Sequence, residues 1–83
     1  MTFFVYIIKS ISGKIRKTYV GYTINIDKRL NAHNNNKGAK STKGYKWKLI
    51  YKKKFKSKSD AMKYEYYLKK NRKEKLKIIQ KID

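Results

Sequence analysis

The sequence begins with two apolar stretches, FFVYIIK at residues 3–9 and KTYVGYT at residues 17–23. Both are rich in β-branched and aromatic residues, which suit the pleated, half-buried surface of a β-strand. The segment between them contains serine, charged residues and Gly13, a typical turn residue. The two stretches are therefore expected to form an antiparallel hairpin.

Tyrosines lie at matching places in the two strands of this hairpin. With the turn centred between residues 12 and 13, antiparallel pairing places Tyr6 directly across from Tyr19, so that both phenols share one face. The same register places Phe4 across from Gly21, where the missing side chain lets another group approach the backbone closely. The alternative is that both tyrosines only fill a half-buried strand surface.

A helix is expected over residues 26–34. Asn25 precedes it and is a typical N-cap residue. Four residues at i, i+3, i+4 and i+7 share one face of this helix: Ile26, Arg29, Leu30 and His33. Residues 34–44, rich in asparagine, glycine and lysine, are expected to form a polar loop.

The second half of the chain predicts one strand and two helices. In residues 47–55 apolar side chains alternate with lysines, which indicates a strand with one buried and one solvated face built from Trp47, Leu49, Tyr51 and Phe55. Ser57 and Asp60 have the spacing of a capping box, which opens a helix over residues 58–71. A last helix over residues 73–82 is expected to dock through Leu76 and Ile79, with Ile82 as a further candidate.

Length and composition limit what these elements can build. A chain of 83 residues forms one small domain, here an α+β fold with a small three-stranded antiparallel sheet flanked by helices. The absence of cysteine excludes disulfides and thiolate metal sites, and it indicates an intracellular protein. The longest apolar run, residues 3–8, is too short to span a bilayer, so no membrane partner is expected.

Net charge indicates the class of partner. The formal charge at pH 7 is +19 on a chain of 10.0 kDa. Such a field attracts polyanions and speeds association with them, so nucleic acid is the first partner to consider. Almost all of the basic residues are lysines, a bias that an AT-rich coding genome would also produce.

The titratable residues exclude several kinds of active site. His33 is the only histidine, and the few carboxylates do not favour a two-metal nuclease centre. Glu65 stands out, because helical periodicity places it on the same inward stripe as Ala61 and Leu68. An acid avoids such a stripe unless it is paired or ligated. The alternative is an ordinary i,i+4 surface pair with Lys69.

Arg29 and His33 lie one turn apart at the edge of a buried stripe. A guanidinium grips a phosphate bidentately and stays charged, which suits charge that builds on a scissile phosphate. A histidine gives or takes a proton near neutral pH. The alternatives are an ordinary surface arginine and a structural histidine.

Together these residues resemble the GIY-YIG nuclease family. Its two name triplets look like Phe4-Val5-Tyr6 and Tyr19-Val20-Gly21 in this chain. Family members carry an arginine and often a histidine on the first helix, and a metal-binding glutamate on a later helix, at spacings that match Arg29, His33 and Glu65. The resemblance covers about residues 3–70. Residues 38–42 are similar to the branch that contains small stand-alone proteins and the catalytic subunit of a branched-DNA endonuclease.

The resemblance implies a divalent-metal-dependent DNA endonuclease that acts on branched, flap or nicked DNA in repair or recombination. Glu65 would hold a single Mg²⁺ or Mn²⁺ ion. Tyr6 would activate the attacking water as a general base or, as an alternative, attack itself, with Tyr19 and Lys40 lowering its pKa or positioning the water. Arg29 would stabilise the phosphate, and His33 would assist proton transfer.

Four residues of the polar loop are expected to contact the DNA: Lys40, Ser41, Thr42 and Lys43. Residues 1–83 would thus form a single GIY-YIG-like nuclease domain. The competing hypothesis is a catalytically inactive, basic nucleic-acid-binding module with the same fold. A partner protein or a homodimer is compatible with either hypothesis.

Overall fold

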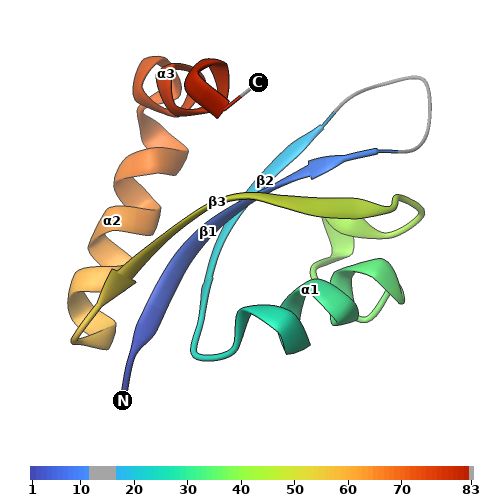
Figure 1. Cartoon of the computed structure of the whole chain (residues 1–83), viewed down its shortest axis with the longest axis horizontal. Helices are drawn as coiled ribbons and strands as arrows, with labels where there is room; N and C mark the ends of the chain where they lie inside the picture. The colour runs from blue at the N-terminus through green and yellow to red at the C-terminus, as the bar shows by residue number, and fades with distance from the viewer. Residues whose placement is uncertain (12–16, 83) are drawn as a thin grey trace.

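The computed structural model describes residues 1–11 and 17–82, except for the side chains of Ser41 and Ile82. The expected turn around Gly13 lies outside these residues. In chain order the described part forms β1 (Phe3–Ser10), β2 (Thr18–Thr23), α1 (Ile26–Asn34), the 3-10 helix η1 (Lys40–Thr42), β3 (Trp47–Phe55), α2 (Lys58–Lys70) and α3 (Arg72–Ile82) (Figure 1). The predicted order of elements is confirmed.

The strands form one antiparallel sheet in the order β2-β1-β3, so β1 is central. Its middle residues are all buried, because the two faces of the sheet are both covered: Val5, Tyr6, Ile7 and Ile8. Successive side chains of a strand point to opposite faces. Helices α2 and α3 cover the face of Val5 and Ile7, and α1 lies on the other side (Figure 1). The predicted α+β fold, a three-stranded antiparallel sheet flanked by helices, is confirmed.

The pairing of β1 with β2 corrects the expected register. Tyr6 lies across from Gly21, and Tyr19 lies across from Ile8, so the expected Tyr6–Tyr19 and Phe4–Gly21 pairs are wrong. The two registers place the same side chains on the same faces, because side chains alternate with a period of two. Apolar patterning therefore cannot separate them. The observed register lets the Tyr6 ring occupy the space above Gly21.

A β-bulge corrects the expected single buried face of β3. Ile7 pairs with Tyr51 whereas Ile8 pairs with Leu49, so β3 has an extra residue between these two pairs. The bulge divides the alternating stripe between the two faces of the sheet. Trp47 and Leu49 pack with Ile8, and Tyr51 joins the core on the α2 side.

Local capping explains where the helices begin. The Asn25 side chain accepts a hydrogen bond from the Lys28 N–H at 3.0 Å, and the Ser57 side chain accepts one from the Asp60 N–H at 3.1 Å. Asn71 separates α2 from α3, because its side chain accepts from the Glu74 N–H at 3.2 Å. The predicted start of α2 is confirmed, and α2 ends one residue earlier than expected.

Helix α3 docks through a residue that was not among those expected. Ile78 packs against the core formed by Val5, Ile7 and Val20, whereas Leu76 is 51% exposed. The described helices include none that is long and apolar enough to cross a membrane.

Asn34 fixes α1 against β3. Its side-chain Oδ1 accepts from the Trp47 N–H at 2.6 Å, and its Nδ2 donates to the Trp47 carbonyl at 3.1 Å. The amide thus pairs with the strand backbone as a neighbouring strand would. This anchor holds the inward face of α1 over Tyr6 and Ile8.

Candidate active site

Three aromatic rings meet on the α1 face of the sheet: those of Tyr6, Tyr19 and His33. Their ring centroids are 6.4 Å apart for the two tyrosines, 5.9 Å for Tyr6 and His33, and 5.1 Å for Tyr19 and His33. The expected sharing of one face by the two phenols is thus observed, although they are diagonal rather than direct neighbours. Tyr6 is only 2% exposed, and the His33 side chain is fully buried.

Gly21 makes room for this cluster. A Cβ atom at this position would lie 2.6 Å from Cζ of Tyr6 and 3.0 Å from Cε2 of Tyr19. Real Cβ atoms essentially never show the distance to Tyr6, and the distance to Tyr19 is tighter than most real contacts, so the Tyr6 ring keeps its position only above a glycine. The expected close approach to Gly21 is therefore made by the protein's own Tyr6.

A chain of hydrogen bonds runs through His33. The Tyr6 hydroxyl lies 2.9 Å from His33 Nε2, and the Thr42 hydroxyl lies 2.9 Å from His33 Nδ1. The Thr42 hydroxyl also donates to the Ala39 carbonyl at 2.7 Å. Every polar atom of the imidazole is thus satisfied inside the protein, as buried polar groups require.

Arg29 completes the α1 contribution to the cluster. Burial raises the pKa of Tyr6, and the hydrogen bond and positive charge of Arg29 oppose this rise. The hydrogen bond with Tyr6 is in turn the main reason that the pKa of Arg29 is raised, with Tyr19 contributing. The nearby phenol of Tyr19 raises the pKa of Tyr6, and Arg29 is the group that lowers it. The other role expected of Tyr19, positioning the water, stays a prediction.

The environment of His33 keeps its imidazole neutral. Burial lowers the pKa of His33, and the positive charge of Arg29 lowers it further. A neutral imidazole has one nitrogen with a proton and one with a free lone pair. His33 is therefore available as a proton acceptor at neutral pH.

Glu65 reaches the cluster from α2. Its side chain is 18% exposed, and its Oε2 lies 3.8 Å from Nζ of Lys69. The Lys69 ammonium also lies 5.7 Å from the centroid of the Tyr19 ring, and the charge of Glu65 acts on the pKa of Tyr6. Lys69 thus links the acid to Tyr19 on β2, which is an edge strand of the sheet, and the acid is near enough to Tyr6 for its charge to act there.

The polar loop divides into exposed and buried residues. Lys40 and Lys43 are exposed, as a DNA contact requires. The Thr42 side chain is fully buried and bonded to His33, so its expected contact with DNA is wrong. The side chain of Ser41 lies outside the described part of the chain.

Sequence reasoning missed two contacts of His33. The Thr42 hydroxyl binds Nδ1, and Gly38 lies so close to the ring that a Cβ there would be 2.9 Å from Cε1. Both residues belong to the loop, five and nine positions after the histidine. The composition of the loop indicated an exposed segment, and no periodic pattern could have indicated that it folds back onto α1.

The donor set suits one hard divalent cation. No group of three or more histidine or carboxylate residues that could hold a metal occurs in the described residues, and Glu65 is the acid whose charge acts on Tyr6. Magnesium usually keeps several waters and binds through one or two carboxylates together with substrate phosphates. A single, largely buried carboxylate whose charge acts on Tyr6 fits this mode of binding.

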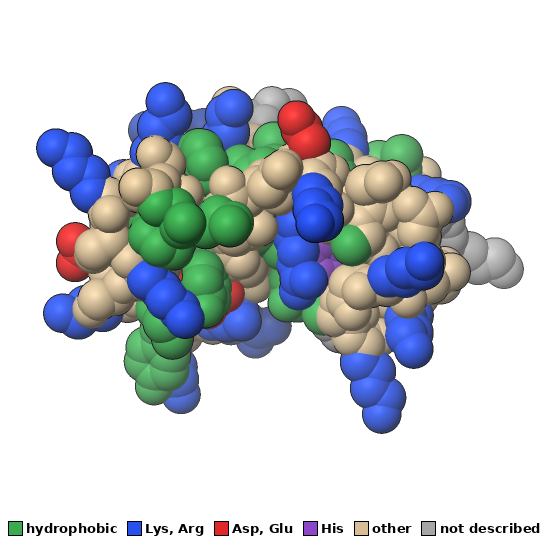
Figure 2. Space-filling model, turned by 90° about the horizontal axis from the view of Figure 1, so that it is seen from below, with side chains coloured by type: hydrophobic (Ala, Val, Ile, Leu, Met, Phe, Trp, Pro, Cys, Tyr) green, Lys and Arg blue, Asp and Glu red, His purple; other side chains and the backbone are tan. Residues whose placement is uncertain are grey.

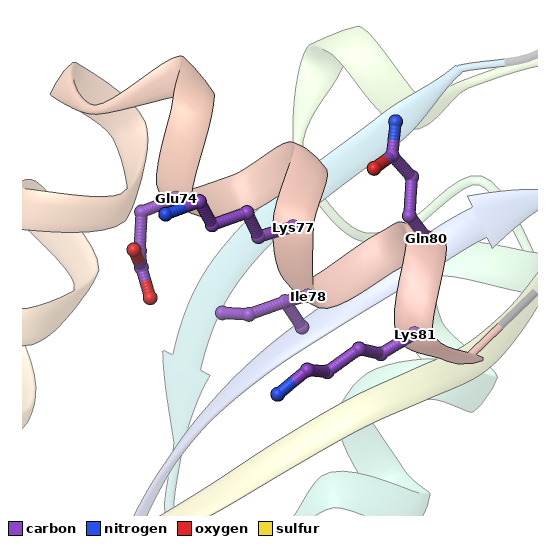
Figure 3. A pocket seen from close by; sticks show the side chains of 5 residues that line it. All are labelled: Glu74, Lys77, Ile78, Gln80 and Lys81. Carbon is purple, nitrogen blue, oxygen red and sulfur yellow. The ribbon is translucent and has the colours of Figure 1, made fainter.

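The surface around the cluster is basic. Figure 2, which shows the molecule from below the view of Figure 1, has Lys and Arg side chains spread over the whole face and few acidic ones. Arg29 also lines a shallow surface pocket with Asn25 and Lys28, so it is accessible from solvent. Another concavity lies along α3, and none of the clustered residues lines it (Figure 3). Its lining consists of Glu74, Lys77, Ile78, Gln80 and Lys81.

The sequence profile of the GIY-YIG catalytic domain matches residues 2–78. The chain belongs to the GIY-YIG family. It is 45% identical over 78 residues to a UPF0213 protein of Clostridium perfringens, which covers 92% of this chain and 81% of the relative. It is 44% identical over 79 residues to a UPF0213 protein of Staphylococcus haemolyticus, which covers 93% of each chain.

A solved GIY-YIG relative has a similar fold. The solution NMR structure of a UPF0213 protein from Bacillus halodurans is 34% identical, with a TM-score of 0.54 over 96% of this chain and 84% of that chain. The resemblance that the sequence suggested, to small stand-alone GIY-YIG proteins, is thus confirmed. The GIY-YIG domain is a nuclease domain, which implies nuclease-type activity on DNA, and such nucleases generally use a divalent metal ion.

Proposed function

We propose that this GIY-YIG protein is a divalent-metal-dependent endonuclease that hydrolyses phosphodiester bonds in DNA, with residues 1–83 acting as one nuclease domain. The single observation that supports this most is the convergence of five residues with four kinds of side chain. Two phenols and an arginine lie around a buried histidine, and the charge of a largely buried glutamate acts on Tyr6. A purely structural cluster has no need for an accessible arginine and an acid.

Arg29 binds the scissile phosphate. It is partly exposed, and the phenols beside it keep its guanidinium firmly charged. Negative charge increases on the phosphate oxygens as the water attacks, and a fixed cation stabilises that charge without having to reorient. Arg29 therefore contributes more to the transition state than to the ground state.

Glu65 would hold the divalent cation, Mg²⁺ or Mn²⁺. When bound, such an ion would supply positive charge that stabilises the negative charge of the reacting phosphate. The carboxylate of Glu65 is oriented by α2 and by its contact with Lys69. Lys69 balances the charge of this acid while no cation is bound.

Tyr6 and His33 move the proton. The raised pKa of Tyr6 means that the phenol is protonated at rest, so it needs an acceptor before it can act as a base. His33 Nε2 lies 2.9 Å from its hydroxyl and provides that acceptor. As the water oxygen bonds to phosphorus, the water proton passes to Tyr6 and the Tyr6 proton passes to His33. The bond to the leaving oxygen breaks at the same time, and that oxygen takes a proton from solvent water.

The lysine-rich surface supports binding to the DNA backbone rather than reading of bases, because exposed lysines bind phosphates without sequence information. Lys40 and Lys43 extend this surface beside the cluster. We propose that the substrate is branched, flap or nicked DNA in repair or recombination, in line with the resemblance of the loop to the branched-DNA endonuclease branch.

A cleavage panel tests this function. The protein is incubated with linear duplex, nicked, flap and four-way-junction DNA, each with Mg²⁺ or with EDTA. The proposal predicts cuts that need Mg²⁺ and that are faster on the branched or nicked substrates. Salt-sensitive binding of every substrate without any cut would instead identify an inactive nucleic-acid-binding module.

A further inference from the structure

We infer that Thr42 is a positioning residue that determines which nitrogen of His33 carries the proton. The inference deepens the proposed function and rests on it, because the nitrogen left free is the one that receives the Tyr6 proton. Thr42 touches neither DNA nor the reacting atoms in this account. It acts through the imidazole alone.

The single proton of the Thr42 hydroxyl decides the arrangement. Its oxygen lies 2.7 Å from the Ala39 carbonyl oxygen and 2.9 Å from His33 Nδ1. A carbonyl oxygen only accepts hydrogen bonds, so the hydroxyl proton is directed at Ala39. If the proton were turned toward Nδ1, lone pairs of two oxygens would face each other at 2.7 Å. The hydroxyl oxygen therefore accepts, and Nδ1 carries the hydrogen.

The state of the other nitrogen follows. A neutral imidazole with its hydrogen on Nδ1 has a lone pair on Nε2. The Tyr6 hydroxyl lies 2.9 Å from Nε2 and must be the donor in that contact. All hydrogen bonds in the chain then run in one direction, from Tyr6 through His33 and Thr42 to the Ala39 carbonyl.

This direction prepares His33 to accept a proton. When Nε2 takes the Tyr6 proton, the imidazolium continues to donate from Nδ1 to Thr42, so no group has to reorient. The opposite tautomer would present an N–H to the Tyr6 oxygen and could accept nothing from it. Thr42 and His33 are both 0% exposed, so water does not compete for either nitrogen.

The surrounding loop keeps Thr42 and the imidazole in place. The Trp47 indole donates from Nε1 to the Thr42 carbonyl at 3.0 Å. Gly38 lies against the ring, where a Cβ would be 2.9 Å from Cε1 and from Cγ of His33. The loop that was expected to contact DNA therefore also holds the imidazole of His33 in position.

Nitrogen-15 NMR of the full chain labelled at His33 tests the inference directly. Wild type should show a protonated Nδ1 and an unprotonated Nε2. Thr42→Val keeps the shape and removes the acceptor, so the proton should move to Nε2. For cleavage we expect kcat to fall about tenfold to a hundredfold while KM for DNA is unchanged, as for the loss of other groups that orient a functional histidine.

Two further variants test whether the loss of the Thr42 hydroxyl itself causes these changes, rather than the mere substitution of a threonine. Thr42→Ser keeps the hydroxyl and should retain the Nδ1–H tautomer and most of the wild-type kcat. Thr18→Val makes the same chemical change on β2, away from His33, and should leave the nitrogen shifts and kcat as in wild type.

Three outcomes would overturn the inference. They are an Nε2–H tautomer in wild type, an unchanged tautomer and kcat in Thr42→Val, or a Thr42→Ser variant that behaves like Thr42→Val. The nitrogen shifts do not depend on cleavage. If the wild-type protein carries its imidazole proton on Nδ1 and yet cuts no DNA, the proposed nuclease function is therefore wrong, whereas the positioning role of Thr42 is supported.

Discussion

The ring of Tyr6 lies directly over Gly21, its cross-strand partner in β2. This contact brings the Tyr6 hydroxyl to His33 Nε2 and lets the ring of Tyr19 approach from the same strand as the glycine. Tyr6, the last residue of the first triplet, and Gly21, the last residue of the second triplet, therefore have complementary shapes. The match links strand pairing to the geometry of the site.

Gly21→Ala should damage both stability and activity. The added Cβ would meet the Tyr6 and Tyr19 rings, both of which are packed against other groups. Overpacking of this kind costs about 1–3 kcal/mol in the free energy of unfolding. Urea unfolding and flap cleavage measure the two effects. Full stability together with wild-type cleavage would contradict the described packing of Tyr6 on Gly21.

Tyr6→Phe should separate chemistry from packing. The ring remains over Gly21, and only the hydroxyl that bonds to His33 is lost. We expect the cleavage rate to fall by about a hundredfold or more, as for other general bases, with a loss of about 1 kcal/mol in the free energy of unfolding. Tyr22→Phe, on the opposite face of β2, is the matched control and should cut normally. Equal rates for the two variants would exclude Tyr6 as the base.

Lys69→Met should raise the affinity for Mn²⁺. Lys69 pairs with Glu65 and so competes with any cation for that carboxylate. A pair of this kind contributes about 0.2–1 kcal/mol, which corresponds to a gain of up to about fivefold in affinity. Titration calorimetry without DNA measures it. Lys63→Met removes the same charge elsewhere on α2, and an equal gain there would show that only net charge matters.

The free energy of unfolding should decrease as the pH is lowered, because of His33. Its pKa is lowered in the folded state by burial and by Arg29, whereas an unfolded histidine has a pKa of about 6.5. Below pH 6.5 the unfolded state therefore binds more protons, and stability is lost as the pH falls toward the folded pKa. The slope reaches at most about 1.4 kcal/mol per pH unit. Denaturation of wild type and His33→Gln between pH 7.5 and 5 measures it. Parallel profiles would contradict this environment for His33.

Much of the fold could be predicted because local patterns determine it. The N-cap of α1, the capping residue of α2 and the apolar strands follow from neighbouring residues. The register of β1 with β2 could not be predicted, because a shift of two residues preserves the face of every side chain. The bulge between Leu49 and Tyr51 could not be predicted either, because it depends on packing against two layers at once.

The site was predictable in its residue types and faces rather than in its connections. Helical periodicity placed Arg29 and His33 on one face of α1, and Glu65 on the inward stripe of α2. The hydrogen bonds of His33 depend on a loop whose composition is that of an exposed segment. Thr42 was therefore expected at the surface, whereas its hydroxyl is fully buried against the imidazole.

The most direct measurement is the rate of flap cleavage in Mg²⁺ by Glu65→Gln compared with Glu74→Gln. Both variants replace a glutamate with its amide and change the net charge equally, but Glu74 lies on α3 outside the phenol cluster. We expect Glu65→Gln to lose nearly all activity and Glu74→Gln to cut as wild type does. Equal, wild-type rates for both variants would contradict the claim that Glu65 and the phenols form one catalytic site.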